Sequence, residues 1–142
     1  MKHLILMVCL VLGWVVSARA MDPAGVMDAV NKERDAIGLP PLVLDAQLNR
    51  LAGEWAVKAA AEKSLAHRKD LSNIRRSQGW NYINENMFSA TGKMDTARLL
   101  RTWMKSPGHR ANLMNPVLTH GGFGFATNKD GETYAVFNGG VK

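Results

Sequence analysis

The chain has 142 residues, of which 46% are hydrophobic and 21% charged, and its formal net charge is +6. This length suits one domain that buries most of its apolar surface, and it leaves little room for a second. The adjacent basic pairs, Arg68-Lys69 and Arg75-Arg76, have no aromatic residues between them. A nucleic-acid surface would need a denser basic stripe with stacking residues, so we do not expect a nucleic-acid partner.

Residues 1–20 have the features of a secretory signal peptide. An apolar run over 4–16 is shorter than the roughly 20 residues of a membrane-spanning helix, and Ala18-Arg19-Ala20 is typical of a cleavage site. We expect a removed leader and one exported domain over 21–142, periplasmic or extracellular, without a transmembrane anchor after cleavage. An uncleaved anchor is the alternative. Cys9 lies inside this leader, so the remaining chain has no thiol chemistry.

Three helices are predicted in the first half of the domain. Asp22-Pro23 is typical of a helix start and Gly38 of its end, with Val26, Val30 and Ile37 expected on one apolar face. An extended connector follows over 39–42, because residues before proline avoid the helical region. Asp45 caps a second helix that ends near Lys63-Ser64 and has an apolar stripe. A short third helix is predicted over 70–76, ending at Gly79.

The second half combines a fourth helix with strands. Residues 80–88 read as an extended segment with Trp80 and Tyr82 facing the core. A helix capped by Asp95 or Thr96 is broken at Ser106-Pro107-Gly108, after which the chain restarts through His109. Strands are predicted over 121–126 and 133–137, joined by a hairpin turn over 128–131. This order predicts an α+β domain with an antiparallel sheet between helical layers.

The stretch from Trp103 to Pro116 carries a specific signature. Trp103, Ser106-Pro107-Gly108-His109-Arg110 and Asn112 resemble the motif of secreted bacterial members of the CAP superfamily, the SCP-like extracellular proteins. Glu85-Asn86 is a second specific match, and supporting matches are Asn31, Leu39 to Leu42 and the glycine-rich strand. The resemblance implies a three-layer α-β-α sandwich with a central antiparallel sheet.

The same resemblance implies a cleft lined by His67, Glu85 and His109, with Asn86 and Ser106 nearby. Two imidazoles and a carboxylate could bind zinc or another divalent metal and leave a position open for water. The set could equally form a hydrogen-bonded network in which Glu85 orients an imidazole. Many eukaryotic CAP domains have a second glutamate where this chain has Ser106, so a mechanism that needs two carboxylates is in doubt.

Three functions follow as expectations. The first is a non-catalytic binding module whose cleft takes a small ligand, a metal or a cell-envelope component. The alternative is a zinc-dependent hydrolase acting on peptides or envelope polymers, with His67, Glu85 and His109 as candidate catalytic residues. The third is a structural or partner-interaction domain. The sequence offers no Gly-x-Ser-x-Gly turn or plausible triad. His120, near the start of a strand, is expected at the surface, and an approach to the cleft is the alternative. Asn84, Asn86 and Asn112 are expected to satisfy buried backbone groups.

Overall fold

A computed structural model describes residues 21–142; the predicted leader, residues 1–20, lies outside the described residues. The helices and strands, in chain order, are α1 (Pro23–Ala36), β1 (Val43–Leu44), α2 (Ala46–Glu62), α3 (Leu71–Ser77), β2 (Tyr82–Thr91), α4 (Thr96–Lys105), α5 (Pro107–Leu113), β3 (His120–Thr127) and β4 (Glu132–Val141). No helix within 21–142 is both long enough and apolar enough to cross a membrane.

The strands form one sheet in the order β1-β3-β4-β2. The three long strands pair antiparallel, β2 with β4 and β3 with β4, as predicted. The short strand β1 is parallel to β3, with Val43 opposite His120 and Leu44 opposite Gly121. The sequence did not predict β1, because two residues are too short to show the alternation that marks a strand.

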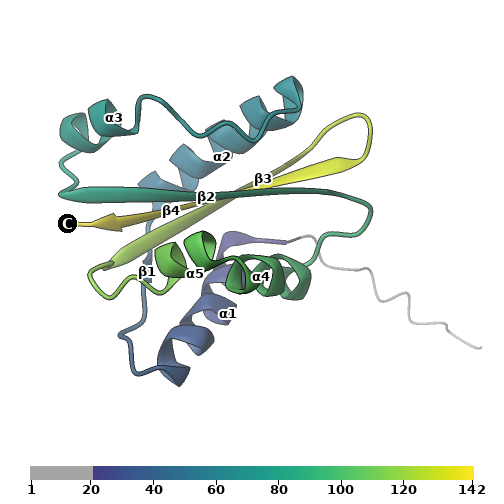
Figure 1. Cartoon of the computed structure of the whole chain (residues 1–142). Coiled ribbons are helices and arrows are strands. Elements are labelled where there is room, and N and C mark those ends of the chain that lie inside the picture. The colour runs from purple at the N-terminus through teal and green to yellow at the C-terminus, as the bar shows by residue number, and fades with distance from the viewer. Residues whose placement is uncertain (1–20) are drawn as a thin grey trace, which may run out of the picture.

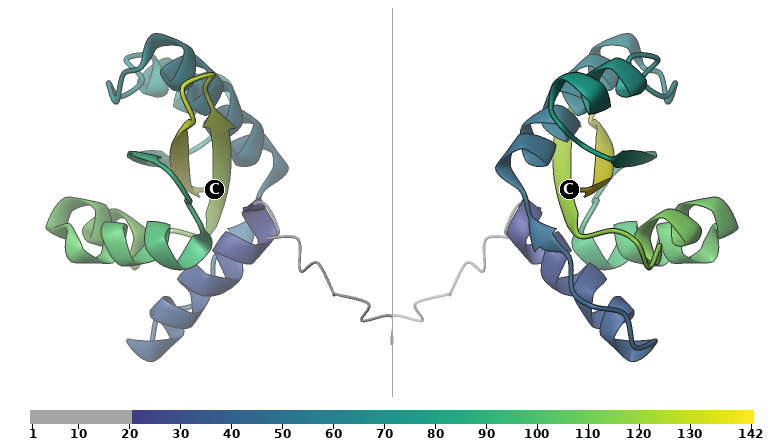
Figure 2. Two further views of the ribbon diagram at one scale, coloured as in Figure 1. Left: turned by 90° about the vertical axis from the view of Figure 1, so that its right-hand side faces the viewer. Right: turned by 90° about the vertical axis from the view of Figure 1, so that its left-hand side faces the viewer.

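Helices cover both faces of the sheet and give the three-layer sandwich that was predicted. α2 and α3 lie on one side of the strands, and α1, α4 and α5 lie on the other (Figures 1 and 2). The alternation along β4 divides the core accordingly. Tyr134 and Val136 pack with the alanines of α2, whereas Ala135 and Phe137 pack in the cluster that α1, α4 and α5 share.

Aspartates start three helices, as the sequence predicts. The Asp22 carboxylate accepts from the N–H of Gly25 at 2.8 Å, Asp45 from the N–H of Gln47 at 2.9 Å, and Asp95 from the N–H of Arg98 at 2.9 Å. Each bond satisfies a backbone donor that the first turn of a helix leaves unpaired.

Some local predictions were wrong. Ile37 follows the last residue of α1 and is 53% exposed, so it does not join Val26 and Val30 in the core. Tyr82 at the start of β2 is 38% exposed, whereas Trp80 is buried. β4 runs on to Val141, because Asn138 and the glycines after it continue the pairing with β2.

Glycines let α2 lie directly on β3. A Cβ at Gly122 would come within 2.3 Å of the backbone nitrogen of Asn49, and one at Gly124 within 2.2 Å of that of Gly53. Any side chain at these positions would push the helix away from the sheet. In return, the Asn49 side chain reaches the strand and its Oδ1 accepts from the N–H of Phe123 at 2.9 Å.

Candidate functional site

The segment between α2 and α3 brings His67 to the sheet. Lys63 ends α2 in the left-handed conformation with φ of 51°, which turns the chain back over the helix. The indole N–H of Trp55 in α2 then donates to the carbonyl of Ala66 at 3.1 Å and holds the returning segment. The segment lies over β2, on the opposite side of that strand from α5 (Figure 1).

Glu85 on β2 contacts this segment through its side chain. Its side chain is 2% exposed. Oε1 accepts from Nδ1 of His67 at 2.9 Å and from the N–H of Arg68 at 3.2 Å, and Oε2 accepts from Nδ2 of Asn138 at 3.4 Å. An ionised carboxylate can only accept, so the proton of a neutral His67 imidazole is on Nδ1. Nε2 of His67 then carries a lone pair, on a side chain that is 61% exposed.

Asn86, the next residue on β2, points to the opposite face and fixes α5. Consecutive residues of a strand alternate between faces, and Asn86 is fully buried. Its Nδ2 donates to the carbonyl of His109 at 2.8 Å, and its Oδ1 accepts from Nδ2 of Asn112 at 2.8 Å. Nδ2 of Asn112 also reaches the Glu85 carbonyl at 3.1 Å. The expectation that these asparagines satisfy backbone groups is confirmed.

His109 lies in the first turn of α5. Proline at position 107 begins this helix, two residues earlier than the predicted restart, because its fixed φ suits a first helical turn. Ser106 takes the N-cap position, is half-buried, and its side chain makes no capping hydrogen bond. Ser106 and His109 are thus brought to the same helix start by the break between α4 and α5.

The surroundings of His109 favour its neutral form. Burial lowers the pKa of His109 below its usual value, and the nearby charge of His67 lowers it further. Its Nδ1 is buried and has no hydrogen-bond partner among the described residues. Of the three predicted residues, the structure joins His67 and Glu85 by a hydrogen bond, while His109 contacts β2 through its backbone carbonyl, which accepts from Asn86.

The donor set falls short of a three-ligand metal centre. Within 21–142, no three His, Cys, Asp or Glu side chains are grouped so that they could hold a metal ion together. The carboxylate oxygens of Glu85 already accept three hydrogen bonds. The remaining atoms that could ligate a metal are Nε2 of His67 and Nδ1 of His109. The residues therefore do not fit a closed zinc site or a site with three protein ligands.

Two groups that donate hydrogen bonds to Glu85 were not predicted from the sequence. Asn138 contacts Glu85 from β4, one residue beyond the end that was predicted for this strand. The Arg68 N–H contacts the same carboxylate, but a backbone donor in a loop gives no signal in the sequence. His120 contacts other residues: its Nδ1 lies 2.7 Å from Oγ1 of Thr119, and its ring packs against the edge of Trp80.

Comparisons with known proteins agree with the geometry. Residues 27–138 match the family model described as CAP, the cysteine-rich secretory protein family. YkwD of Bacillus subtilis (strain 168) is 29% identical over 104 residues, which are 70% of this chain and 40% of YkwD. The chain thus spans less than half the length of that relative.

Two solved structures share the fold. An outer surface protein from Borrelia burgdorferi has a TM-score of 0.75 and 21% identity, over 84% of this chain and 91% of that one. An extracellular protein with an SCP domain from Bacillus anthracis str. Ames has a TM-score of 0.67 and 24% identity, over 84% of this chain and 40% of that one.

Proposed function

Because the chain belongs to the cysteine-rich secretory protein (CAP) family, we propose that it is a non-catalytic binding module. Its cleft presents the imidazoles of His67 and His109 to a small ligand, a divalent metal or a cell-envelope component. The observation that carries the proposal is the engagement of Glu85, whose two oxygens accept from His67, Arg68 and Asn138.

Hydrolysis would need a group that Glu85 does not supply. A general base must offer a lone pair to water, and the three hydrogen bonds that Glu85 accepts leave about one acceptor site on a side chain that is 2% exposed. A second carboxylate is missing, since Ser106 occupies the position at which the resemblance to many eukaryotic CAP domains would imply glutamate. The site therefore does not have one carboxylate for a metal ligand and another for a general base, and we assign no hydrolytic step to it.

The site supplies imidazole nitrogens that a ligand can bind. Nε2 of His67 has a lone pair on an exposed ring, and Nδ1 of His109 is buried without a partner among the described residues. A cavity of about 410 Å³ adjoins His67 and is lined also by Trp55, Ser64 and Asp70. A ligand in this cavity that meets the His67 imidazole can place an apolar part against Trp55 and a polar part against Asp70.

Zinc chloride is a suitable probe of the two imidazoles, because neutral imidazole binds this ion whatever the natural ligand is. We would titrate it by calorimetry near pH 7.5 into the protein and into His67→Ala, His109→Ala and His120→Ala. We expect weak binding that both cleft variants lose and that His120→Ala keeps. Zinc binding that is absent, or equal in all four proteins, would contradict a cleft in which two imidazoles converge.

The same variants distinguish the binding module from a hydrolase and from a purely structural domain. Turnover of a peptide or peptidoglycan substrate that disappears in His109→Ala would contradict the non-catalytic proposal in favour of a hydrolase. A purely structural role predicts that His67→Ala or His109→Ala lowers the free energy of unfolding by about 1–3 kcal/mol, as unpaired buried partners do, without any change in zinc binding.

We also propose that the domain is exported, in keeping with the apolar and small residues of 1–20. The expected result is a mature protein that begins at Met21 and is recovered outside the cytoplasm. Mass spectrometry of the protein from fractionated cells measures this, and recovery of an intact leader in the cytoplasm would contradict it.

A further inference from the structure

A second surface lies on the other helical layer of the molecule, in the groove between α1 and α4. The groove has a volume of about 710 Å³. Its floor is apolar and consists of Ala29 from α1 with Ala97, Leu100 and Met104 from α4. Leu100 and Met104 are half-buried and pack at the edge of the core cluster.

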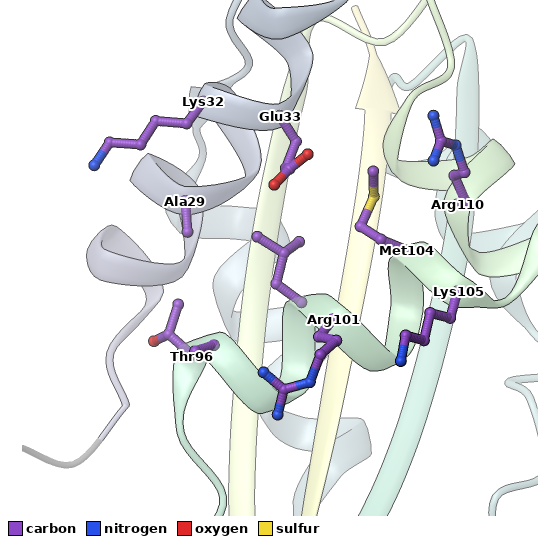
Figure 3. A pocket seen from close by; sticks show the side chains of 10 residues that line it. Ala29, Lys32, Glu33, Thr96, Arg101, Met104, Lys105 and Arg110 are labelled. Atoms are coloured by element: carbon purple, nitrogen blue, oxygen red, sulfur yellow. The ribbon is translucent and has the colours of Figure 1, made fainter.

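Cations surround this floor. Lys32 stands on α1, Arg101 and Lys105 on α4, and Arg110 on α5, and Glu33 is the one acid among the groove's lining residues (Figure 3). All four cations are exposed, and none takes part in the ion pairs of residues 21–142. The lining residues therefore have a surplus of three positive charges, and Asp95, which is outside the lining, lies near enough to interact with the charge of Arg101.

We propose that this groove docks an acidic amphipathic segment of a partner protein. Apolar side chains of the segment contact Leu100 and Met104, and carboxylates on its flanks pair with Arg101, Lys105 and Arg110. Methionine is flexible and polarizable, so it adapts to side chains of different shape. A helix laid in a groove buries apolar anchors at intervals of three and four residues, which suits a floor of this kind.

The spread of the cations favours a peptide over a ligand with one negative charge. The four cations stand on three different helices around the floor, so a single carboxylate or phosphate would meet one side of the rim and leave the rest unpaired. An acidic peptide places several negative charges around an apolar centre. Such complementarity raises the association rate and fixes the register more than it raises the affinity.

This inference goes beyond the proposed function and does not depend on it. The cleft uses Glu85 and the segment between α2 and α3, while the groove uses α1 and α4. The two share only α5, where Arg110 follows His109. His109→Ala is thus expected to leave peptide docking unchanged, and a failure of one proposal does not carry over to the other.

The test uses the protein and a synthetic 18-residue helical peptide that carries leucines on one face and glutamates on both flanks. Fluorescence anisotropy measures the affinity for this peptide and for a scrambled peptide of the same composition. The variant is Arg101→Glu with Lys105→Glu. The matched control is Arg50→Glu with Lys129→Glu, which makes the same change in net charge at exposed positions on α2 and in the turn between β3 and β4.

We expect the affinity for the amphipathic peptide to fall at least tenfold in the groove variant and less than threefold in the control. The scrambled peptide should bind at least tenfold more weakly than the amphipathic one. Equal losses in the two variants, or equal binding of the two peptides, would overturn the proposal, because attraction by net charge alone would then explain the result. Binding to vesicles of anionic phospholipid without binding to the peptide would overturn it in favour of a membrane surface.

Circular dichroism checks that both double variants are folded before their affinities are compared. As a second variant, Met104→Gln removes apolar contact without changing charge and should weaken the amphipathic peptide at least threefold. Unchanged affinity in Met104→Gln would overturn the claim that the groove floor takes the apolar anchors.

Discussion

The two histidines of the proposed cleft differ in which ring nitrogen has no hydrogen-bond partner among the described residues. Glu85 takes the Nδ1 proton of His67 and so fixes which nitrogen faces outward. His109 has its backbone carbonyl held by Asn86, while its Nδ1 is buried without a partner among residues 21–142. A buried polar atom without a partner costs free energy, so a ligand that satisfies it gains affinity. Substitution of His109 should therefore reduce the ligand affinity most.

The pKa of His109 gives the cleft a pH dependence. Burial and the charge of His67 lower the pKa of His109 from the usual 6.5, so the unfolded chain takes up this proton first as the pH falls. Stability from this group is complete above about pH 6.5. It is lost as the pH falls from there through the folded pKa.

NMR titration of the imidazole resonances measures this directly. We expect a folded pKa of His109 below 6.5, and we expect it to rise in His67→Ala because the charge of His67 is removed. His120→Ala is the control and should leave it unchanged. A His109 pKa above 6.5 would show that the ring is not in a desolvated site.

At the scale of the elements, the contact between α2 and β3 sets the position of the cleft, since the segment that carries His67 leaves the end of α2. Gly122→Ala would place a methyl group 2.3 Å from the backbone of Asn49, and we expect a loss of about 3 kcal/mol in the free energy of unfolding or failure to fold. Gly53→Ala is the matched control, because a Cβ there meets nothing within 4 Å, and it should stabilise by about 0.5–1 kcal/mol. Chemical denaturation of both variants tests the pair, and similar effects would contradict the close approach.

Most elements could be predicted from the sequence because their signals are local. The caps at Asp22, Asp45 and Asp95 and the alternation of Tyr134 to Phe137 each depend on near neighbours. Strand β1 could not be predicted, since Val43 and Leu44 are a strand only by pairing with β3 from the far end of the chain. The contact of Glu85 with His67 likewise joins residues 18 positions apart, and only the resemblance to a family placed them together.

At the scale of the whole molecule, Arg34 connects segments that are distant in the sequence. It is fully buried in α1. Its Nε donates to the carbonyl of Pro40 at 2.9 Å, and Nη1 donates to those of Leu113 and Asn115 at 2.9 and 3.0 Å. The guanidinium thus joins α1, the connector before β1 and the end of α5, the helix that carries His109. Arg34 was not predicted as a core residue, because an arginine is expected at the surface even where its position, four residues after Val30, lies on the apolar face.

Arg34→Met is expected to lower the free energy of unfolding by about 2–4 kcal/mol, because it leaves three backbone carbonyls without their donor. The exposed Arg50 is the control, and Arg50→Met should change stability by no more than about 0.5 kcal/mol. Thermal denaturation compares the two. Equal stability of the two variants would mean that Arg34 does not hold the layers together.

The central claim is that Glu85 orients His67 and is not free to act as a base. The nitrogen-15 chemical shifts of the His67 imidazole test it most directly, because they distinguish a proton on Nδ1 from one on Nε2. The account predicts the Nδ1–H form in the protein and a shift toward the other form in Glu85→Ala, with His120 as an unaffected internal reference. An Nε2–H form of His67 in the unmodified protein would contradict it, since Glu85 would then have no proton to accept from that ring.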